Sequence, residues 1–454
     1  MNPDVVVIGG GLAGWAAAVS AAEAGASVTL LEKTDAFGGS TVLSGGFFAL
    51  AGTPMQRELG IDDEAGILEQ DLIEVGEGRN NRALVHAYAE GQKEFWHWLT
   101  RHGWEPLDIE LSSGQTVARS HRSNTKDFIP KLVAHGTELG VEVLLDAPVT
   151  SLVTEAGRVV GIRTDEGEIR AAAVVLATGG FSRSEEMLAQ YAPQNVRAVR
   201  VGGKGSTGDG LRMALEVGAH ARDFEFIKGT FGTHPSTTTD QHQFLLDYYL
   251  GAIIVDRYGK RFVDESISYK LIGDACLALE DPIAFQVFDQ AILDSAPHGV
   301  ALFDPRPMID NGKILTSDTL EGLAGRMSVP VPALVRTVAR YNEALATGSM
   351  DEFGRTGLVN GTGKLVPIQT APYYAFPSTT ALIATYCGLS VDPSARVLTE
   401  SGEPIPGLWA VGEVVGGFHG AAYMTGSSLG KAAFFGMVAG RTAARSTRPE
   451  VKAS

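Results

Sequence analysis

Three glycines and one glutamate near the start of the chain have the spacing of a dinucleotide-binding turn. Gly9, Gly11 and Gly14 follow the apolar run 4–8, and Glu32 closes a second apolar run about twenty residues further on. Glycines let the backbone approach a pyrophosphate, and the N-terminus of the following helix adds partial positive charge. A carboxylate at the end of the second strand can accept a hydrogen bond from a ribose hydroxyl. The spacing predicts a bound dinucleotide without deciding between NAD and FAD.

Further glycine-rich segments favour FAD. The segments 38–46, 177–180, 205–210 and 407–436 resemble the FAD-binding elements of the fumarate reductase and 3-ketosteroid dehydrogenase flavoprotein superfamily. Members with covalently attached flavin carry a histidine in the loop that Gly39 and Ser40 occupy here, so we expect non-covalent FAD. Beyond the first turn, the resemblance implies cofactor contacts from Lys33, Gly39, Ser40, Thr41, Gly45, Gly46, Val149, Thr178, Gly179, Asp209, Gly412, Glu413, Ser428 and Leu429.

Two tyrosines stand where the resemblance to fumarate reductases implies arginines. Tyr423 lies at the position of an arginine that grips the substrate carboxylate, and Tyr269 at that of the arginine that delivers a proton. A phenol of pKa ~10 can hydrogen-bond a carbonyl oxygen, and a phenolate can remove a proton from the adjacent carbon. Paired tyrosines are similar to those of 3-ketosteroid 1-dehydrogenases. They predict α,β-desaturation of a ketone, cyclic or steroid-like, with Tyr269 as base. That both tyrosines only pack the cap stays an alternative.

Two histidines match substrate-binding positions of the same superfamily. His234 precedes Pro235, and His419 lies in the run GGFHGA, so the resemblance implies that both are catalytic or substrate contacts. A structural role for His234 stays open. A second hypothesis is a fumarate reductase-like enzyme for a small unsaturated carboxylic acid, in which these histidines and Arg119 or Arg122 hold the carboxylate. A third is a flavin-binding protein without turnover.

These residues require an α/β fold to position them. The sequence predicts strands at 4–8, 141–145, 149–154, 158–164, 173–177 and 252–255, and helices at 126–139, 282–294 and 330–346. The resemblance implies a discontinuous Rossmann-like FAD-binding domain, residues 1–229 and 375–454, with an inserted α+β capping domain at 230–374. Within the cap, Arg261 and Glu265 are expected to be structural.

The composition of the chain disfavours some classes of binding partner. The 454 residues carry 37 basic and 53 acidic side chains, a net charge of −16, which disfavours nucleic acid and anionic membranes. Cys276 and Cys387 lie in no CxxC motif, and His97, His102 and His242 have no metal-ligand spacing, so we expect no disulfide framework and no metal. No signal peptide or membrane span is visible. We expect a cytoplasmic enzyme with a small-molecule substrate and an unidentified electron acceptor.

Overall fold

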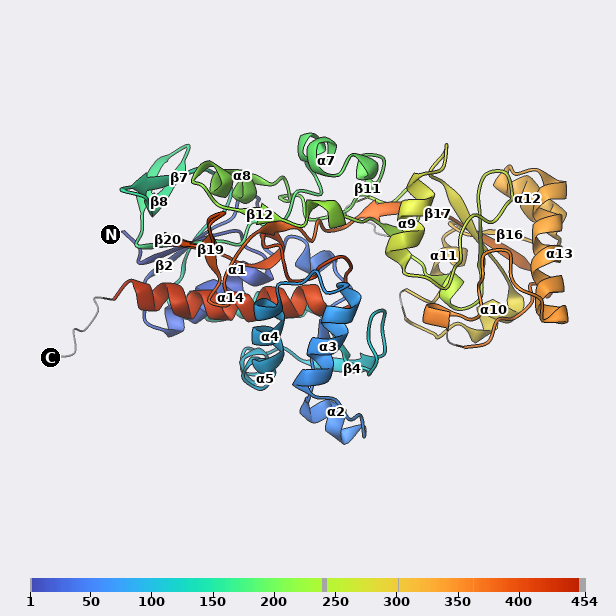
Figure 1. Ribbon diagram of the computed structural model, residues 1–454, viewed down its shortest axis with the longest axis horizontal. Helices are drawn as coiled ribbons and strands as arrows, with labels where there is room; N and C mark the ends of the chain where they lie inside the picture. Colours follow the sequence, from blue (N-terminus) through green and yellow to red (C-terminus); the bar gives the residue numbers. More distant parts are fainter. Residues whose placement is uncertain (1, 239–242, 301, 362, 449–454) are drawn as a thin grey trace. The chain divides into compact units, whose positions relative to one another are not determined.

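The structure is a computed structural model that describes residues 2–238, 243–300, 302–361 and 363–448. Its chain forms two compact units (Figure 1). The first contains Met1–Ala192, Gly202–Ile227 and Ala384–Ser454, and the second contains Pro193–Val201 and Lys228–Ile383. The second unit includes residues 193–201 and 375–383, which we expected in the FAD-binding domain. Strand β11 lies within residues 193–201 and pairs with strand β17, which joins this segment to the second unit.

A six-stranded sheet forms the centre of the first unit, in the order β19-β20-β10-β1-β2-β6. Neighbouring strands from β20 to β6 pair in parallel. Strand β19, at the edge, pairs antiparallel with β20. Every residue of β1, VVVI, is buried, as expected for a strand covered on both faces. The strands are β1 (Val5–Ile8), β2 (Val28–Leu31), β6 (Glu142–Leu144), β10 (Ala173–Leu176), β19 (Arg396–Leu398) and β20 (Pro404–Ala410).

Helices α1 and α14 come from opposite ends of the chain and lie side by side (Figure 1). Small residues allow this approach, because a Cβ on Gly440 would lie 2.2 Å from the carbonyl oxygen of Ala17. The α-helices of the first unit are α1 (Leu12–Glu23), α2 (Pro54–Glu58), α3 (Ala65–Val75), α4 (Arg82–Glu90), α5 (Gln92–Arg101), α6 (Thr125–Glu138), α7 (Glu185–Tyr191), α8 (Asp209–Glu216) and α14 (Ser427–Ser446).

Three small antiparallel sheets complete the first unit, in the orders β3-β5-β4, β7-β8-β9 and β12-β18. Their strands are β3 (Phe47–Ala49), β4 (Pro106–Glu110), β5 (Ser120–Ser123), β7 (Val149–Glu155), β8 (Arg158–Thr164), β9 (Gly167–Arg170), β12 (Ala221–Arg222) and β18 (Gly388–Leu389). Short 3-10 helices of the two units lie at Thr41–Leu43, Pro193–Asn195, Phe224–Phe226, Asp247–Tyr249, Val359–Gly361 and Gly412–Val414.

The second unit is built around strand β17, which pairs with β11, β13, β15 and β16. Its strands are β11 (Val199–Arg200), β13 (Thr230–Thr233), β14 (Ile253–Val255), β15 (Ala284–Asp289), β16 (Leu315–Ser317) and β17 (Tyr373–Leu382). Its α-helices are α9 (Tyr269–Leu277), α10 (Gln290–Ser295), α11 (Arg306–Asp310), α12 (Leu320–Met327) and α13 (Val331–Thr347).

The predicted helix at 282–294 is wrong over its first half. Residues 284–289 form the inner strand β15, and only the short helix α10 follows. All six residues of β15 are buried, so no polar–apolar alternation marks the strand in the sequence. The predicted α/β class is confirmed by the parallel sheet and its covering helices. None of the described helices combines the length and apolar character that a membrane span requires.

Candidate active site

The predicted glycines lie in the turn between β1 and α1, where neighbouring backbone atoms approach them closely. A Cβ on Gly9 would lie 2.3 Å from the carbonyl oxygen of Ala177, and a Cβ on Gly14 would lie 1.9 Å from that of Gly9, so neither position accepts a side chain. Helix α1 begins after Gly11 with no acidic residue in its first turn. The positive end of the helix dipole therefore faces the turn with no acidic side chain of that helix turn to neutralise it.

The acidic and basic residues after β2 have defined partners. Glu32 accepts hydrogen bonds from the backbone N–H of Gly10 (2.8 Å) through one oxygen and of Thr34 (2.9 Å) through the other. The Thr34 hydroxyl also donates to the second of these oxygens (2.9 Å), so the oxygen bound by Gly10 keeps further acceptor capacity for a ribose hydroxyl. The ammonium group of Lys33 lies 2.5 Å from the carboxylate of Asp209. The structure thus brings together two predicted cofactor residues from β2 and α8.

The second glycine-rich loop packs onto the start of α1. The hydroxyl of Thr41 accepts a hydrogen bond from the backbone N–H of Leu12 (3.2 Å), and Ser40 Oγ accepts one from the N–H of Gly203 (2.9 Å). The loop and the first turn therefore form one surface. The other predicted residues of this loop are Gly39, Gly45 and Gly46.

The segment directly after β10 contains two further predicted cofactor residues, Thr178 and Gly179. Thr178 Oγ1 is buried and has no hydrogen-bond partner among the described residues. A Cβ on Gly179 would lie 3.2 Å from Ser206 Oγ, so the backbone there approaches the segment before α8. Val149 opens strand β7 and pairs with Thr164. An orphaned hydroxyl of this kind marks a position where a bound group supplies the missing partner.

These features fit a dinucleotide cofactor. The glycine turn has room for backbone contact, and the first turn of α1 has no acidic residue. Glu32 can accept a ribose hydrogen bond, and Thr178 Oγ1 has no hydrogen-bond partner among the residues described. Together they supply the donors and acceptors that a pyrophosphate and a ribose require.

The segment after β20 contains a buried pair of opposite charges. Glu413 accepts a hydrogen bond from the backbone N–H of Thr385 (2.9 Å), and burial raises the pKa of its carboxyl. The ammonium group of Lys431 donates to the carbonyl oxygen of Val415 (2.7 Å), and burial lowers its pKa to about 8. Gly412 lies against α1, since a Cβ there would be 2.8 Å from the Cβ of Ala13.

Tyr423 caps the N-terminus of α14. Its hydroxyl oxygen accepts a hydrogen bond from the backbone N–H of Gly426 (3.0 Å). Burial raises the pKa of the Tyr423 phenol, and hydrogen bonds from Gly426 and Ser428 partly offset that increase. Ser428 and Leu429 form the first turn of this helix. The phenol oxygen therefore sits among donors that stabilise negative charge on it.

His419 and Tyr386 flank Tyr423. The rings of Tyr386 and Tyr423 stack with centroids 4.9 Å apart, and the His419 ring lies 5.4 Å from Tyr423. Ser427 donates its hydroxyl hydrogen to Met424 O (2.6 Å), so in the 3.3 Å contact between Ser427 Oγ and His419 Nδ1 the ring nitrogen donates. The neutral His419 ring then keeps Nε2 as an acceptor.

Tyr386 is a site residue that the sequence analysis missed. Its backbone φ is +55°, an unusual value for a bulky residue and one that carries strain. Strain of this kind is retained where the side chain is held for a purpose, here stacked on Tyr423 and 5.2 Å from the His419 ring. The only sequence signal was its place two residues before Gly388, where the chain returns to the first unit.

Tyr269 begins helix α9 in the second unit and is buried. Its backbone N–H donates to the hydroxyl of Tyr249 (2.9 Å), which itself donates to Ile267 O (2.8 Å). The buried ammonium group of Lys270 lies 5.6 Å from the centroid of the Tyr269 ring and donates to Thr230 Oγ1 (2.6 Å). Tyr269 therefore lies beside a buried cation at the start of α9.

Asp247 is an unusual carboxyl in the same unit. It is buried, and neither carboxyl oxygen has a hydrogen-bond partner among the residues that the structure describes. Burial raises its pKa to about 8, and the charge of Asp304 adds to the increase. Asp247 directly precedes Tyr248 and Tyr249, whose rings lie 4.6 Å apart.

His234 lies at the end of β13 in the second unit. Its Nδ1 accepts hydrogen bonds from the N–H (3.1 Å) and hydroxyl (2.8 Å) of Ser236, so the neutral ring carries its hydrogen on Nε2. Burial, with a smaller effect from Lys313, lowers the pKa of His234 to about 4. His234 is therefore a neutral donor at pH 7.

The arginines considered for carboxylate binding already have acidic partners. Arg119 is fully buried, and its guanidinium lies 3.1 Å from both Asp63 and Asp71. Arg122 is paired with Asp108. In the second unit, Arg261 holds Glu265 through two hydrogen bonds of 2.7 and 2.5 Å and also contacts Asp351. These contacts support the structural role expected for Arg261 and Glu265.

A parallel sheet with a glycine turn, an acid after the second strand and a glycine-rich C-terminal segment defines a dinucleotide-fold flavoprotein. Residues 4–429 match the FAD binding domain family, and the chain belongs to that family. The protein is therefore an FAD-dependent oxidoreductase, as the sequence predicts.

Its relatives include both reductases and dehydrogenases. The chain is 31% identical, over 98% of its length, to the NADH:fumarate oxidoreductase of Klebsiella pneumoniae (strain 342), of which it spans 48%. It is 30% identical to a flavocytochrome c3 fumarate reductase in the open conformation, with a TM-score of 0.86 over 98% of this chain and 79% of that one. It is 29% identical to the 3-ketosteroid-Δ4-(5α)-dehydrogenase of Rhodococcus jostii RHA1 in complex with 4-androstene-3,17-dione, with a TM-score of 0.76 over 97% and 96% of the two chains.

Proposed function

We propose that the protein catalyses α,β-desaturation of a ketone, cyclic or steroid-like, to the conjugated enone. The observation that carries the proposal is the position of Tyr423. Its oxygen accepts a hydrogen bond from the N–H of Gly426 at the start of α14, so its own hydrogen is free to donate to a substrate carbonyl. A phenol surrounded by donors polarises a neutral oxygen well, whereas it provides no cation to hold a carboxylate.

The remaining roles follow from the charges around each side chain. Tyr269 is the proposed base for the α-proton: it is buried at the start of α9, and the ammonium group of Lys270 lies 5.6 Å from the centroid of its ring. His234 is a neutral donor suited to orienting a carbonyl rather than neutralising an acid. His419 and Tyr386 hold the ring of Tyr423. Bound FAD would supply hydride acceptance at N5, with the residues of the two glycine-rich loops holding it.

Two single substitutions test these roles. We expect Tyr423→Phe and Tyr269→Phe each to lower kcat by ~10²-fold or more, the scale of a lost proton-transfer or polarising group. Bound flavin, measured by its visible absorbance, should stay stoichiometric. Tyr258→Phe, at an exposed tyrosine of the second unit, is the matched control and should keep full activity. A decrease in kcat of less than threefold in both Tyr423→Phe and Tyr269→Phe would contradict the proposal.

The second candidate is oxidation or reduction of a small unsaturated carboxylic acid. It is supported by the fumarate-reducing relatives and by the presence of His234 and His419. It requires a cation for the carboxylate, and Arg119 and Arg122 are both already paired with acidic side chains. We therefore rank it below the ketone proposal.

A further inference from the structure

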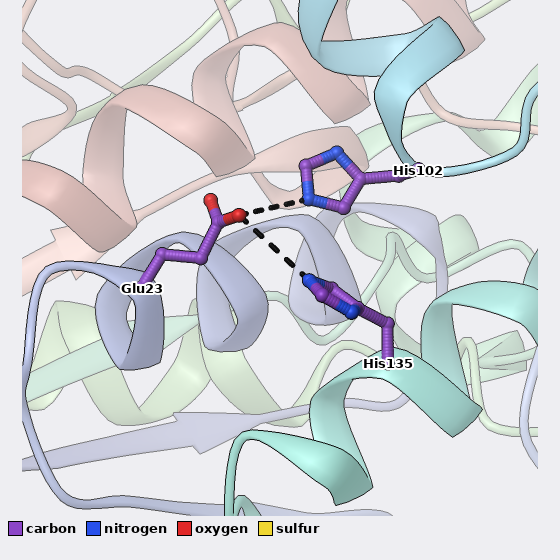
Figure 2. A group of neighbouring side chains, drawn as sticks. All are labelled: Glu23, His102 and His135. Atoms are coloured by element: carbon purple, nitrogen blue, oxygen red, sulfur yellow. Dashed lines mark hydrogen bonds and ion pairs between the residues drawn. The ribbon is translucent and has the colours of Figure 1, made fainter.

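Glu23, His102 and His135 converge at the ends of three helices of the first unit. Figure 2 shows their side chains pointing toward one another from the last residue of α1, the residue after α5 and the last turn of α6. His102 Nε2 lies 3.2 Å and His135 Nε2 lies 3.7 Å from the same oxygen of Glu23. The structure thus places His102 in a group of possible metal ligands that its sequence spacing did not indicate. His97 is exposed, and His242 lies outside the described residues.

The hydrogen bonds of His102 fix which ring nitrogen is available. Nδ1 lies 2.6 Å from the carbonyl oxygen of Trp98, which only accepts, so Nδ1 carries the hydrogen. In the neutral ring, the lone pair of Nε2 then faces the carboxylate of Glu23. Two acceptors at this separation need a cation between them.

We propose that Glu23, His102 and His135 bind a divalent transition-metal ion of the Zn²⁺ type. Two imidazole nitrogens and a carboxylate oxygen are a donor set that this class of ion prefers over Mg²⁺ or Ca²⁺. Ligand atoms about 2.1 Å from a tetrahedral ion lie about 3.4 Å apart. The two separations from Glu23 are 3.2 and 3.7 Å, and all three ligand atoms lie within 4.8 Å of one another. Water would complete the coordination.

Neighbouring groups support the ligands. The Trp98 carbonyl fixes the tautomer of His102, as outer partners of metal-binding histidines usually do. Arg101 donates to both oxygens of Glu23 at 3.1 Å, but its side chain is largely exposed and can turn away when a metal neutralises the carboxylate.

The site is separate from the proposed chemistry. It lies at the C-terminal end of α1, whereas the glycine turn lies at the other end, roughly 17 Å away along twelve residues of helix. A metal there joins α1, α5 and α6, so it should raise the stability of the first unit without changing the reaction.

Titration calorimetry of untagged, flavin-loaded protein after chelator treatment tests the site. We expect one Zn²⁺ per chain and a rise in Tm on binding, with Mg²⁺ giving neither. His135→Ala and Glu23→Gln, at partly exposed side chains, should weaken Zn²⁺ binding by ~10-fold or more and abolish the rise in Tm. The control His97→Ala, at the exposed histidine of α5, should bind as wild type does. Absence of stoichiometric Zn²⁺ binding, or binding unchanged in both ligand variants, would overturn the proposal.

Discussion

At the residue scale, the chemistry depends on what surrounds each tyrosine. Tyr423 receives a hydrogen bond from the start of α14, and Tyr269 begins α9 beside the ammonium group of Lys270. The donors around Tyr423 stabilise charge on its oxygen, while burial raises the pKa of its phenol. Neither tyrosine offers a permanent cation to a carboxylate, which is why we favour a ketone.

Asp247 gives a prediction about stability against pH. Its pKa is about 8 in the folded protein and near ~3.9 in the unfolded chain, so the folded state binds one more proton between these values. Stability from this group is present below pH ~4 and is lost as pH rises toward 8, by at most about 1.4 kcal/mol per pH unit. Asp247→Asn removes this titration. The free energy of unfolding of this variant, relative to that of wild type, should therefore increase from pH 5 to pH 8.

Urea denaturation at pH 5, 6.5 and 8 measures this difference. Asp310→Asn, at an exposed aspartate of the same unit, is the control and should differ from wild type by a constant amount. A difference between Asp247→Asn and wild type that does not change with pH would show that Asp247 is ionised or solvated in the folded protein.

At the element scale, the sequence predicted the parts with strong local signals. The run VVVI, the glycine turn and the stretch after β20 each have a pattern that few other structures share. Strand β15 lacked such a signal, because burial of all its residues removes the alternation that distinguishes a strand from a helix. Tyr386 and the Glu23–His102–His135 group were missed because tertiary packing joins residues that are distant in sequence.

The contact between α1 and α14 gives a prediction about packing. A Cβ on Gly440 would lie 2.2 Å from Ala17 O and 2.8 Å from Ala21 N, both backbone atoms that cannot yield easily. We expect Gly440→Ala to lower the free energy of unfolding by roughly 1–3 kcal/mol, the scale of overpacking. Thermal and urea denaturation would measure the change.

A glycine with open space serves as the control for that substitution. Gly66 lies in α3 of the same unit, and the nearest atom to its added Cβ is a Glu64 oxygen at 3.8 Å. Gly66→Ala should be neutral or stabilising by up to about 1 kcal/mol, because alanine favours helix. Equal destabilisation by both substitutions would contradict the close packing of α1 on α14.

At the scale of the whole molecule, relatives that share this fold act on substrates of different charge. The relatives include a fumarate reductase and a ketosteroid dehydrogenase, so family membership fixes FAD and redox chemistry but leaves the substrate open. The substrate class must then be argued from the side chains of each unit. In this chain, acidic side chains engage Arg119, Arg122 and Arg261.

The most direct measurement is the rate at which the flavin reacts with ketones and with carboxylic acids. Stopped-flow absorbance should follow flavin reduction by cyclic and steroid ketones, and reoxidation of the photoreduced enzyme by the matching enones, fumarate and acrylate. We expect ketones to reduce the flavin, and enones to reoxidise it at least ~10²-fold faster than fumarate or acrylate does. Tyr423→Phe should remove this preference. Rapid reoxidation by fumarate or acrylate, with no response to any ketone or enone, would contradict the ketone proposal.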